Sequence, residues 1–473
     1  MAETMRFENR MSDADGLMWA IEKDPLLRST ITAVAVLDQA PDHKGLADAF
    51  ERTSRAVPRL RQRVVGNPYS LVPPRWEVDP NFDLAYHLRW VRCPGDGGLR
   101  DLLGVAEPVA MQGFDRARPL WEVVLVEDMA DGQAGAVIKL HHSITDGVGA
   151  VRIGMHLFDL ERDAWRDRDD RVDEPLVRIL SPVERLVDGL RHESRRQIDL
   201  ARRMTGAATR TAASARRDLA GTARGVRRTA ESLVRMLTPV TAPLSGLMTG
   251  RSLSVHFDTV TVPLDELKGG ARVAGGSLND AFVAAVLGGM RRYHLAHADV
   301  AEALRMTMPI NVRTDDTADL AGNQFVPARF TVPLHIEDPV ARMQAVHELV
   351  AEQRAEPALA LTGPVAGLLY RLPTSVSTTI FGAMLKGIDL VTSNVPGVPI
   401  PVYLAGARME SQFAFAPRTG AATNITLLSY LDQVHVAVNT DPAAIPDADA
   451  FQACLLEGFE EIQSLSRPKP RHR

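Results

Sequence analysis

The chain has 473 residues, of which 45% are hydrophobic and 24% are charged, and its formal net charge is −5. This length exceeds one ordinary hydrophobic core, so we expect two domains in a globular protein of average composition. The negative charge argues against bulk nucleic-acid binding, and two cysteines, Cys93 and Cys454, provide neither a disulfide framework nor a thiolate metal site.

Residues 1–180 are predicted to form a first domain in which helices alternate with strands. Helices are expected where apolar residues recur every three or four positions, and strands where β-branched residues cluster. The predicted helices cover residues 11–24, 43–57 and 99–111, and the predicted strands cover residues 31–37, 60–65, 119–126 and 136–141. The last two strands flank a turn at Asp131 and Gly132, which favours a hairpin.

Residues 181–250 are predicted to be a basic helical linker. Between residues 191 and 228 there are eleven arginines, three acidic residues and no aromatic residue, a composition typical of a helical or partly disordered connection. One interpretation is a solvated linker between domains. The other places residues 191–248 on an anionic membrane or lipid surface, where each basic residue contributes about 1 kcal/mol.

Residues 251–473 are predicted to form a second domain of strands and helices. The expected strands cover 304–311, 323–334 and 390–397, and the expected helices cover 278–293, 340–354 and 446–467, with a late hairpin over 425–438. Their mixed order favours an α/β sandwich with a mixed sheet over a doubly wound parallel sheet. Neither a GxGxxG nor a GxxxxGKS phosphate loop occurs.

Targeting signals are missing from the sequence. The first residues lack the apolar core of a signal peptide, and no apolar run reaches the ~18 residues of a membrane span. Together with the cysteine usage of a reducing compartment, this predicts a cytoplasmic protein, either soluble or peripheral on the inner face of the membrane or on lipid inclusions.

The sequence Leu-His-His-Ser-Ile-Thr-Asp-Gly at 140–147 is the strongest candidate for chemistry. A strand feeds it and a helical pattern leaves it, an arrangement that holds a side chain out at a strand end. Histidine has an ordinary pKa of about 6.5, which suits a general base near neutral pH. Adjacent side chains on a strand point to opposite faces, so His141 and His142 should not share one cavity. For the same reason a metal site built on His141, His142 and Asp146 is a weak alternative.

With this motif, the sequence resembles the bacterial wax ester synthase/diacylglycerol acyltransferase family, within the chloramphenicol acetyltransferase-like superfamily. Further blocks match in order along nearly the whole chain. They are Pro-Leu-Trp at 119–121, Asn-Asp at 279–280, Pro-Ile-Asn-Val-Arg at 309–313, Gly-Asn-Gln-Phe at 322–325, Thr-Ser-Asn-Val-Pro-Gly at 392–397 and Asn-Ile-Thr-Leu-Leu-Ser-Tyr at 424–430.

The resemblance implies an α/β protein of two chloramphenicol acetyltransferase-like sandwich domains with a channel between them. It also implies transfer of a long-chain acyl group from acyl-CoA to diacylglycerol or a fatty alcohol, without a cofactor or metal. In the superfamily the base is the histidine four residues before the aspartate, here His142. Asp146 would organise the turn by pairing with an arginine, for which Arg313 is the candidate. No GxSxG elbow is present, so no covalent acyl-enzyme is expected.

The other candidate residues have a structural and a functional interpretation. His141 either shapes the turn or takes a direct part, and Gly147 is expected to allow a tight turn. The resemblance assigns a larger set to substrate binding. The structural alternatives are a buried strand for the first three residues, a helix start for the next two and a strand edge for the last two: Pro119, Leu120, Trp121, Asn279, Asp280, Ser393 and Asn394.

Two alternatives to neutral-lipid synthesis stay open. The same chemistry could act on another lipid or a secondary-metabolite hydroxyl, because the shape of the channel selects the acceptor. The fold could also serve a non-catalytic lipid-droplet or membrane-binding protein, although the intact His142 and Asp146 argue against this. The expected partners are therefore acyl-CoA and a lipid hydroxyl acceptor, with no nucleic acid.

Overall fold

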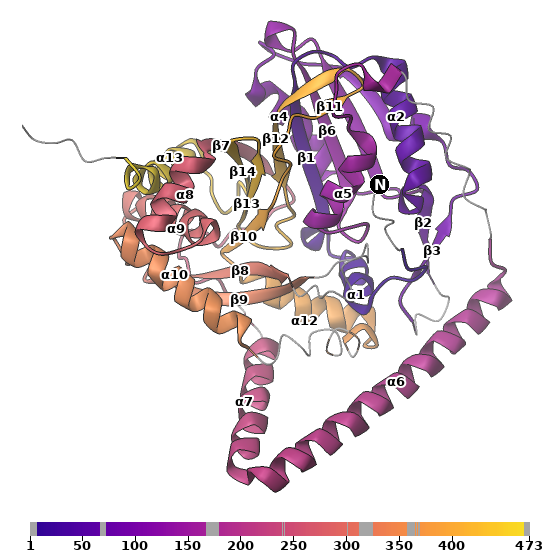
Figure 1. Ribbon diagram of the computed structural model, residues 1–473, viewed down its shortest axis with the longest axis vertical. Helices are drawn as coiled ribbons and strands as arrows, with labels where there is room; N and C mark the ends of the chain where they lie inside the picture. Colours follow the sequence, from indigo (N-terminus) through magenta and orange to yellow (C-terminus); the bar gives the residue numbers. More distant parts are fainter. Residues whose placement is uncertain are drawn as a thin grey trace, which may run out of the picture.

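Two domains and a long helical arm make up the molecule (Figure 1). The structure is a computed structural model, and it describes residues 7–66, 72–166, 179–238, 240, 242–299, 301–311, 325–356, 365, 367 and 369–467. Each domain is built on a six-stranded sheet in which parallel and antiparallel pairs are mixed. This confirms the predicted α/β class with mixed sheets in two domains.

The N-terminal sheet has the order β11-β12-β1-β6-β5-β4. Its strands are β11 (Tyr403–Leu404), β12 (Ala407–Phe415), β1 (Thr30–Leu37), β6 (Ala134–His141), β5 (Trp121–Glu127) and β4 (Leu88–Arg92). Only β4 and β5 pair in parallel. β11 and β12 come from the C-terminal half of the chain, so the second half completes the first sheet.

Helices cover both faces of this sheet. α2 (His43–Ala56) and α5 (Gly147–Leu157) lie on one face, where the core includes Phe50 and Trp121. α4 (Leu99–Met111) covers the other face, where Val34 and Val137 share a cluster with Phe257 of the second domain. The remaining N-terminal elements are α1 (Asp13–Ile21), α3 (Leu84–His87) and the small hairpin of β2 (Gln62–Val65) and β3 (Arg75–Val78).

The C-terminal sheet has the order β7-β14-β13-β10-β8-β9. Its strands are β7 (His256–Pro263), β14 (Gln433–Thr440), β13 (Thr423–Tyr430), β10 (Leu390–Val395), β8 (Ala303–Asn311) and β9 (Phe325–Pro333). β10 lies parallel to both of its neighbours, β8 and β13. Its last residue, Val395, lies against Gly147 of the N-terminal domain, and this contact matters for the site described below.

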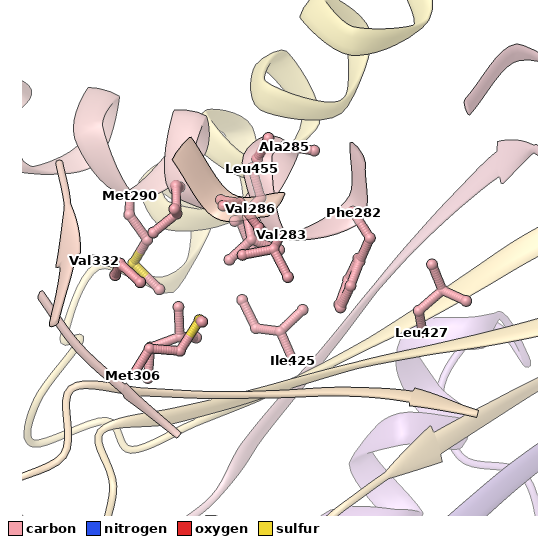
Figure 2. Close-up of a cluster of buried hydrophobic side chains, with 14 of the residues drawn as sticks. Phe282, Val283, Ala285, Val286, Met290, Met306, Val332, Ile425, Leu427 and Leu455 are labelled. Atoms are coloured by element: carbon pink, nitrogen blue, oxygen red, sulfur yellow. The ribbon is translucent and has the colours of Figure 1, made fainter. Parts of the chain in front are cut away.

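The core of the C-terminal domain lies between this sheet and α9 (Leu278–Ala296). Figure 2 shows Phe282, Val283, Val286 and Met290 of α9 above Met306, Ile425 and other sheet residues. α9 is buried along most of its length because further helices cover it. These are α8 (Leu264–Val273), α10 (Pro339–Arg354) and α13 (Ala448–Ser464). α12 (Thr374–Lys386) instead contacts α1 of the first domain.

The predicted linker is helical from Pro182 to Leu237, and its described residues 242–250 form no helix. α6 (Pro182–Arg217) and α7 (Leu219–Leu237) form a V that projects from the two domains (Figure 1). Within the described residues, no single helix has both the length and the apolar composition of a membrane span. The α8–α9 pair, bent by 92°, meets that criterion jointly.

Candidate active site

The two histidines stand at the end of β6 and are bonded to opposite neighbouring strands. The backbone N–H of His141 donates to the carbonyl of Leu120 at 3.0 Å, and that of His142 donates to the carbonyl of Ser29 at 2.8 Å. Successive residues of a strand direct their side chains to opposite faces. His141 therefore faces one side of the sheet, which Lys139 shares, and His142 faces the other.

His141 is buried and both of its ring nitrogens are bonded. Its Nε2 lies 2.8 Å from Glu22 Oε1, and its Nδ1 accepts the backbone N–H of Ser143 at 3.0 Å. An acceptor Nδ1 carries no proton, so Nε2–H is the donor to Glu22. The rings of Trp19 and Phe114 meet the imidazole edge-on, at 5.5 and 6.1 Å between centroids. Protein groups therefore engage both ring nitrogens of His141.

His142 is half-buried, whereas His141 is 1% exposed. The backbone of His142 is fixed by the hydrogen bond to Ser29, and His142 precedes the turn that leads into α5. The histidine motif therefore presents one imidazole to the protein interior and one to the opposite, more accessible side. Of the pair, only His142 has the exposure that a base acting on an external substrate needs.

Asp146 and Gly147 shape the turn below the histidines. Asp146 is the N-cap of α5, and its Oδ1 accepts the backbone N–H of Gly149 at 2.9 Å. Gly147 does not have a positive φ. A Cβ at this glycine would lie 2.8 Å from Val395 Cγ2, so its small size is needed where β10 approaches the turn. Arg313, the predicted partner of Asp146, lies outside the described residues, and the pair stays a prediction.

The Pro-Leu-Trp block lies in the core next to the turn. Pro119 is buried, and Leu120 and Trp121 are 0% and 3% exposed. The indole N–H of Trp121 donates to the carbonyl of Leu60 at 2.7 Å, and the indole stacks on His87 with 4.4 Å between centroids. This block supports β6 through the Leu120 carbonyl, and its side chains are part of the N-terminal core.

Asn279 and Asp280 lie at the start of α9 in the C-terminal domain. Asp280 forms a capping box with Ser277 and also accepts from His347 Nδ1 at 3.0 Å. The amide of Asn279 contacts Met308 Sδ at 3.7 Å. These contacts join the start of α9 to β8 and α10, and they do not reach the histidine turn.

Ser393 and Asn394 are closer to the turn than this pair, because they belong to β10. Ser393 is half-buried and Asn394 is exposed. Val395, the next residue, is the one that meets Gly147. Because side chains alternate along a strand, Ser393 shares the face of Val395 toward the turn, and Asn394 points to the opposite face.

Around His141 this face of the sheet is polar, and His141 and Glu22 line a cavity of about 290 Å³ there. Burial raises the pKa of the Glu22 carboxyl, but its interactions with His141 and the Ser29 N–H outweigh this effect, so its pKa lies below the ordinary value. Burial also lowers the pKa of Lys139, whose ammonium is 3.7 Å from Glu122. A second cavity, of about 60 Å³, lies between residues of the two domains, such as Thr32 and Phe415.

A metal centre finds no support among the residues that the structure describes, because no group of three potential ligands gathers there. The sequence interpretation did not identify Glu22 and Ser29, which hold the turn. Glu22 is separated from His141 by 119 positions. In the sequence, Glu22 stands out only as an acidic residue near the end of the helix predicted over residues 11–24.

Comparisons with known proteins place this site in a family. Residues 11–282 match the wax ester synthase/diacylglycerol acyltransferase catalytic domain, and residues 321–463 match the C-terminal domain of the same family. A Mycobacterium tuberculosis H37Rv protein named as a candidate diacylglycerol O-acyltransferase is 36% identical over 470 residues, which cover 99% of this chain and 95% of that protein. Another from the same strain, with the same kind of name, is 29% identical and covers 97% and 98%.

Solved structures share the fold. The wax ester synthase/diacylglycerol acyltransferase from Marinobacter aquaeolei VT8 has a TM-score of 0.61 at 21% identity, and covers 97% of this chain and 99% of its own. The first condensation domain of the calcium-dependent antibiotic synthetase, in complex with a substrate analogue, has a TM-score of 0.59 at 16% identity, covering 96% of both chains. The chain therefore belongs to the wax ester synthase/diacylglycerol acyltransferase family and is an acyltransferase.

Proposed function

We propose that the protein transfers a long-chain acyl group from acyl-CoA to the hydroxyl of diacylglycerol, of a fatty alcohol, or of both, with His142 as the general base. The observation that carries this proposal is the intact histidine turn, in which His141 is bonded at both nitrogens and His142 is the accessible partner. The relatives named as diacylglycerol O-acyltransferases support the choice of acceptor.

In this mechanism the base acts on the acceptor hydroxyl. Nε2 of His142 takes the hydroxyl proton as the oxygen attacks the thioester carbonyl, and the C–S bond then breaks. The imidazolium returns the proton to the CoA sulfur, so the products are an ester and free CoA. Acid–base catalysis of this kind is worth about 10²–10⁴-fold. The chemistry uses no metal and no cofactor.

The test is a substrate matrix of acyl-CoA chain lengths against diacylglycerol and hexadecanol, with free CoA measured by a thiol reagent. His142→Ala should lower CoA release by about 10²–10⁴-fold. His335→Ala, which removes an exposed histidine of the C-terminal domain, should not. If no acceptor gives release above the His142→Ala control, the proposal fails for those substrates. Overexpression that leaves neutral lipids unchanged would instead favour another hydroxyl acceptor.

We also propose that α6 and α7 hold the protein on an anionic bilayer, where its lipid substrates reside. Apolar residues follow one face of α6 at helical spacing and are exposed, among them Val183, Leu190 and Met204 at 70%, 57% and 64%. On α7, Leu219 and Val226 are exposed to a similar degree. Such an unpartnered apolar stripe beside arginines is typical of helices that lie in a membrane interface.

Ion pairs orient α6 so that this apolar stripe faces outward. Arg185 donates to both oxygens of Glu77, at 3.0 and 2.8 Å. One turn later Asp188 accepts from Arg75, and Arg196 pairs with Asp13 at 2.6 Å. These α6 residues lie on the helix face opposite Val183 and Leu190. The first half of α6 is therefore fastened to the N-terminal domain by its polar face.

Vesicle sedimentation tests this contact. The combined change Leu190→Ser, Met204→Ser and Leu219→Ser should reduce binding to vesicles containing phosphatidylglycerol, and Arg210→Glu with Arg217→Glu should do the same. Binding should weaken as salt rises. A matched control, Leu295→Ser with Leu456→Ser, removes exposed leucines from the C-terminal domain and should bind as the unchanged protein does. Equal binding by all variants would leave α6 and α7 as a plain linker.

A further inference from the structure

We infer that Glu22 is a positioning residue for acyl transfer, because it fixes both the ring of His141 and the residue to which His142 is bonded. Glu22 follows directly after α1, on the face of the turn opposite His142. Its side chain is 9% exposed, so its carboxylate is almost entirely removed from solvent. The inference rests on the proposed role of His142 as the base.

A single oxygen of Glu22 reaches the turn by two routes. Oε1 accepts the Nε2–H of His141 at 2.8 Å and the backbone N–H of Ser29 at 2.6 Å. The carbonyl of Ser29 in turn accepts the backbone N–H of His142 at 2.8 Å. The carboxylate thus joins the start of β1 to the end of β6, where both histidines stand.

The second oxygen of Glu22 and its surroundings complete a cage around His141. Arg116 lies 3.6 Å from Oε2, and its guanidinium lies 4.1 Å from the centroid of the Trp19 ring. Trp19 in turn meets the imidazole of His141 edge-on. A buried carboxylate is costly unless it is paired and hydrogen-bonded. Here two N–H donors and a guanidinium offset that cost. The two donors belong to His141, in the turn, and to Ser29, which bonds to His142.

Loss of these bonds should act on the rate more than on substrate binding. Without Oε1 the His141 ring loses its Nε2 acceptor, and Ser29 loses the bond that sets its position. The backbone of His142 is hydrogen-bonded to Ser29, so a shift of Ser29 should displace His142. A displacement of about 1 Å at a reacting group can cost about 10²-fold in rate. Glu22 lines the cavity on the face of the strand opposite His142, and we expect acyl-CoA and acceptor to react at His142 without touching it.

The test compares Glu22→Leu, which removes both acceptors, with Glu22→Gln, which keeps one oxygen able to accept. We expect kcat to fall about 10²-fold in Glu22→Leu with little change in the KM for acyl-CoA, and to be largely restored in Glu22→Gln. Glu457→Leu, which removes an exposed carboxylate paired with Arg292 in the C-terminal domain, should keep the normal kcat. Proton NMR of the histidine rings should show that the Nε2–H of His141 loses its hydrogen bond, seen as an upfield shift and faster exchange with solvent, only in Glu22→Leu.

All variants are assayed at a temperature at which circular dichroism shows them to be folded. A kcat for Glu22→Leu within threefold of the unchanged enzyme would overturn the inference, and so would a folded Glu22→Gln that is no better than Glu22→Leu. The two proposals fail separately. Activity that survives His142→Ala refutes the proposed base, whereas an inactive His142→Ala beside a fully active Glu22→Leu refutes only the role of Glu22.

Discussion

The two adjacent histidines face opposite sides of β6, and their proposed roles differ accordingly. The alternation of side chains along a strand, visible in the sequence, already separated His141 from His142. What the sequence could not supply was the partner of each. His141 is bonded to Glu22 and Ser143, and only the second of these is near in the chain. Local spacing therefore identified the motif, while the assignment of a holding role to His141 needed the three-dimensional contacts.

Gly147 illustrates the same limit, since its small size is required by a residue of the other domain. An alanine here should lower activity, because its Cβ would meet Val395 Cγ2 at 2.8 Å and valine is stiff about its first side-chain torsion. Overpacking typically costs about 1–3 kcal/mol. We expect Gly147→Ala to reduce kcat and the unfolding midpoint, and Gly147→Ala with Val395→Ala to recover both. Equal effects of the single and the double variant would show that Val395 is not the cause.

At the scale of elements, the sequence predicted the helices and strands that have their own apolar periodicity or capping residues. The helices α2, α4, α9, α10 and α13 and the strands β1, β5, β6, β8 and β13 lie where periodicity and caps indicated them. β12 was not predicted: four of its nine residues, Ala-Arg-Met-Glu-Ser-Gln-Phe-Ala-Phe, are polar, and it becomes a strand because it pairs with β1. β4 and β11 are edge strands of five and two residues, too short to give a clear periodic signal.

The contact between α9 and α13 depends on glycines that the apolar pattern alone does not explain. A Cβ at Gly458 of α13 would lie 2.3 Å from the Ala285 carbonyl and 2.6 Å from the Gly289 nitrogen, both of which are backbone atoms of α9. The helices would have to separate, so Gly458→Ala should lower the free energy of unfolding by about 1–3 kcal/mol. Gly225→Ala in α7, where nothing lies within 4 Å, should instead raise local helix stability by about 0.5–1 kcal/mol. Urea unfolding followed by circular dichroism measures both, and a harmless Gly458→Ala would contradict the close packing.

On the scale of the whole molecule, the two domains are interlocked. β12 leaves the second half of the chain to pair with β1, and Phe415 on that strand stacks on Phe257 of β7 with 3.9 Å between centroids. The same cluster contains Val34 of β1 and Ala437 of β14. A division of the sequence near residue 250 therefore follows the linker but cuts the N-terminal sheet, which takes β11 and β12 from the second half of the chain.

This interlocking predicts that the domains unfold together, and the tryptophans provide the means to test it. All five tryptophans, Trp19, Trp76, Trp90, Trp121 and Trp165, precede residue 180, so their fluorescence reports the N-terminal domain, whereas circular dichroism reports both. The two transitions should coincide. Phe415→Ala, a change in the second half of the chain, should shift the fluorescence transition by the equivalent of about 3–5 kcal/mol, and Leu456→Ala on the exposed face of α13 should leave it in place. Separate transitions, with fluorescence unmoved by Phe415→Ala, would show that the N-terminal sheet is stable without β12.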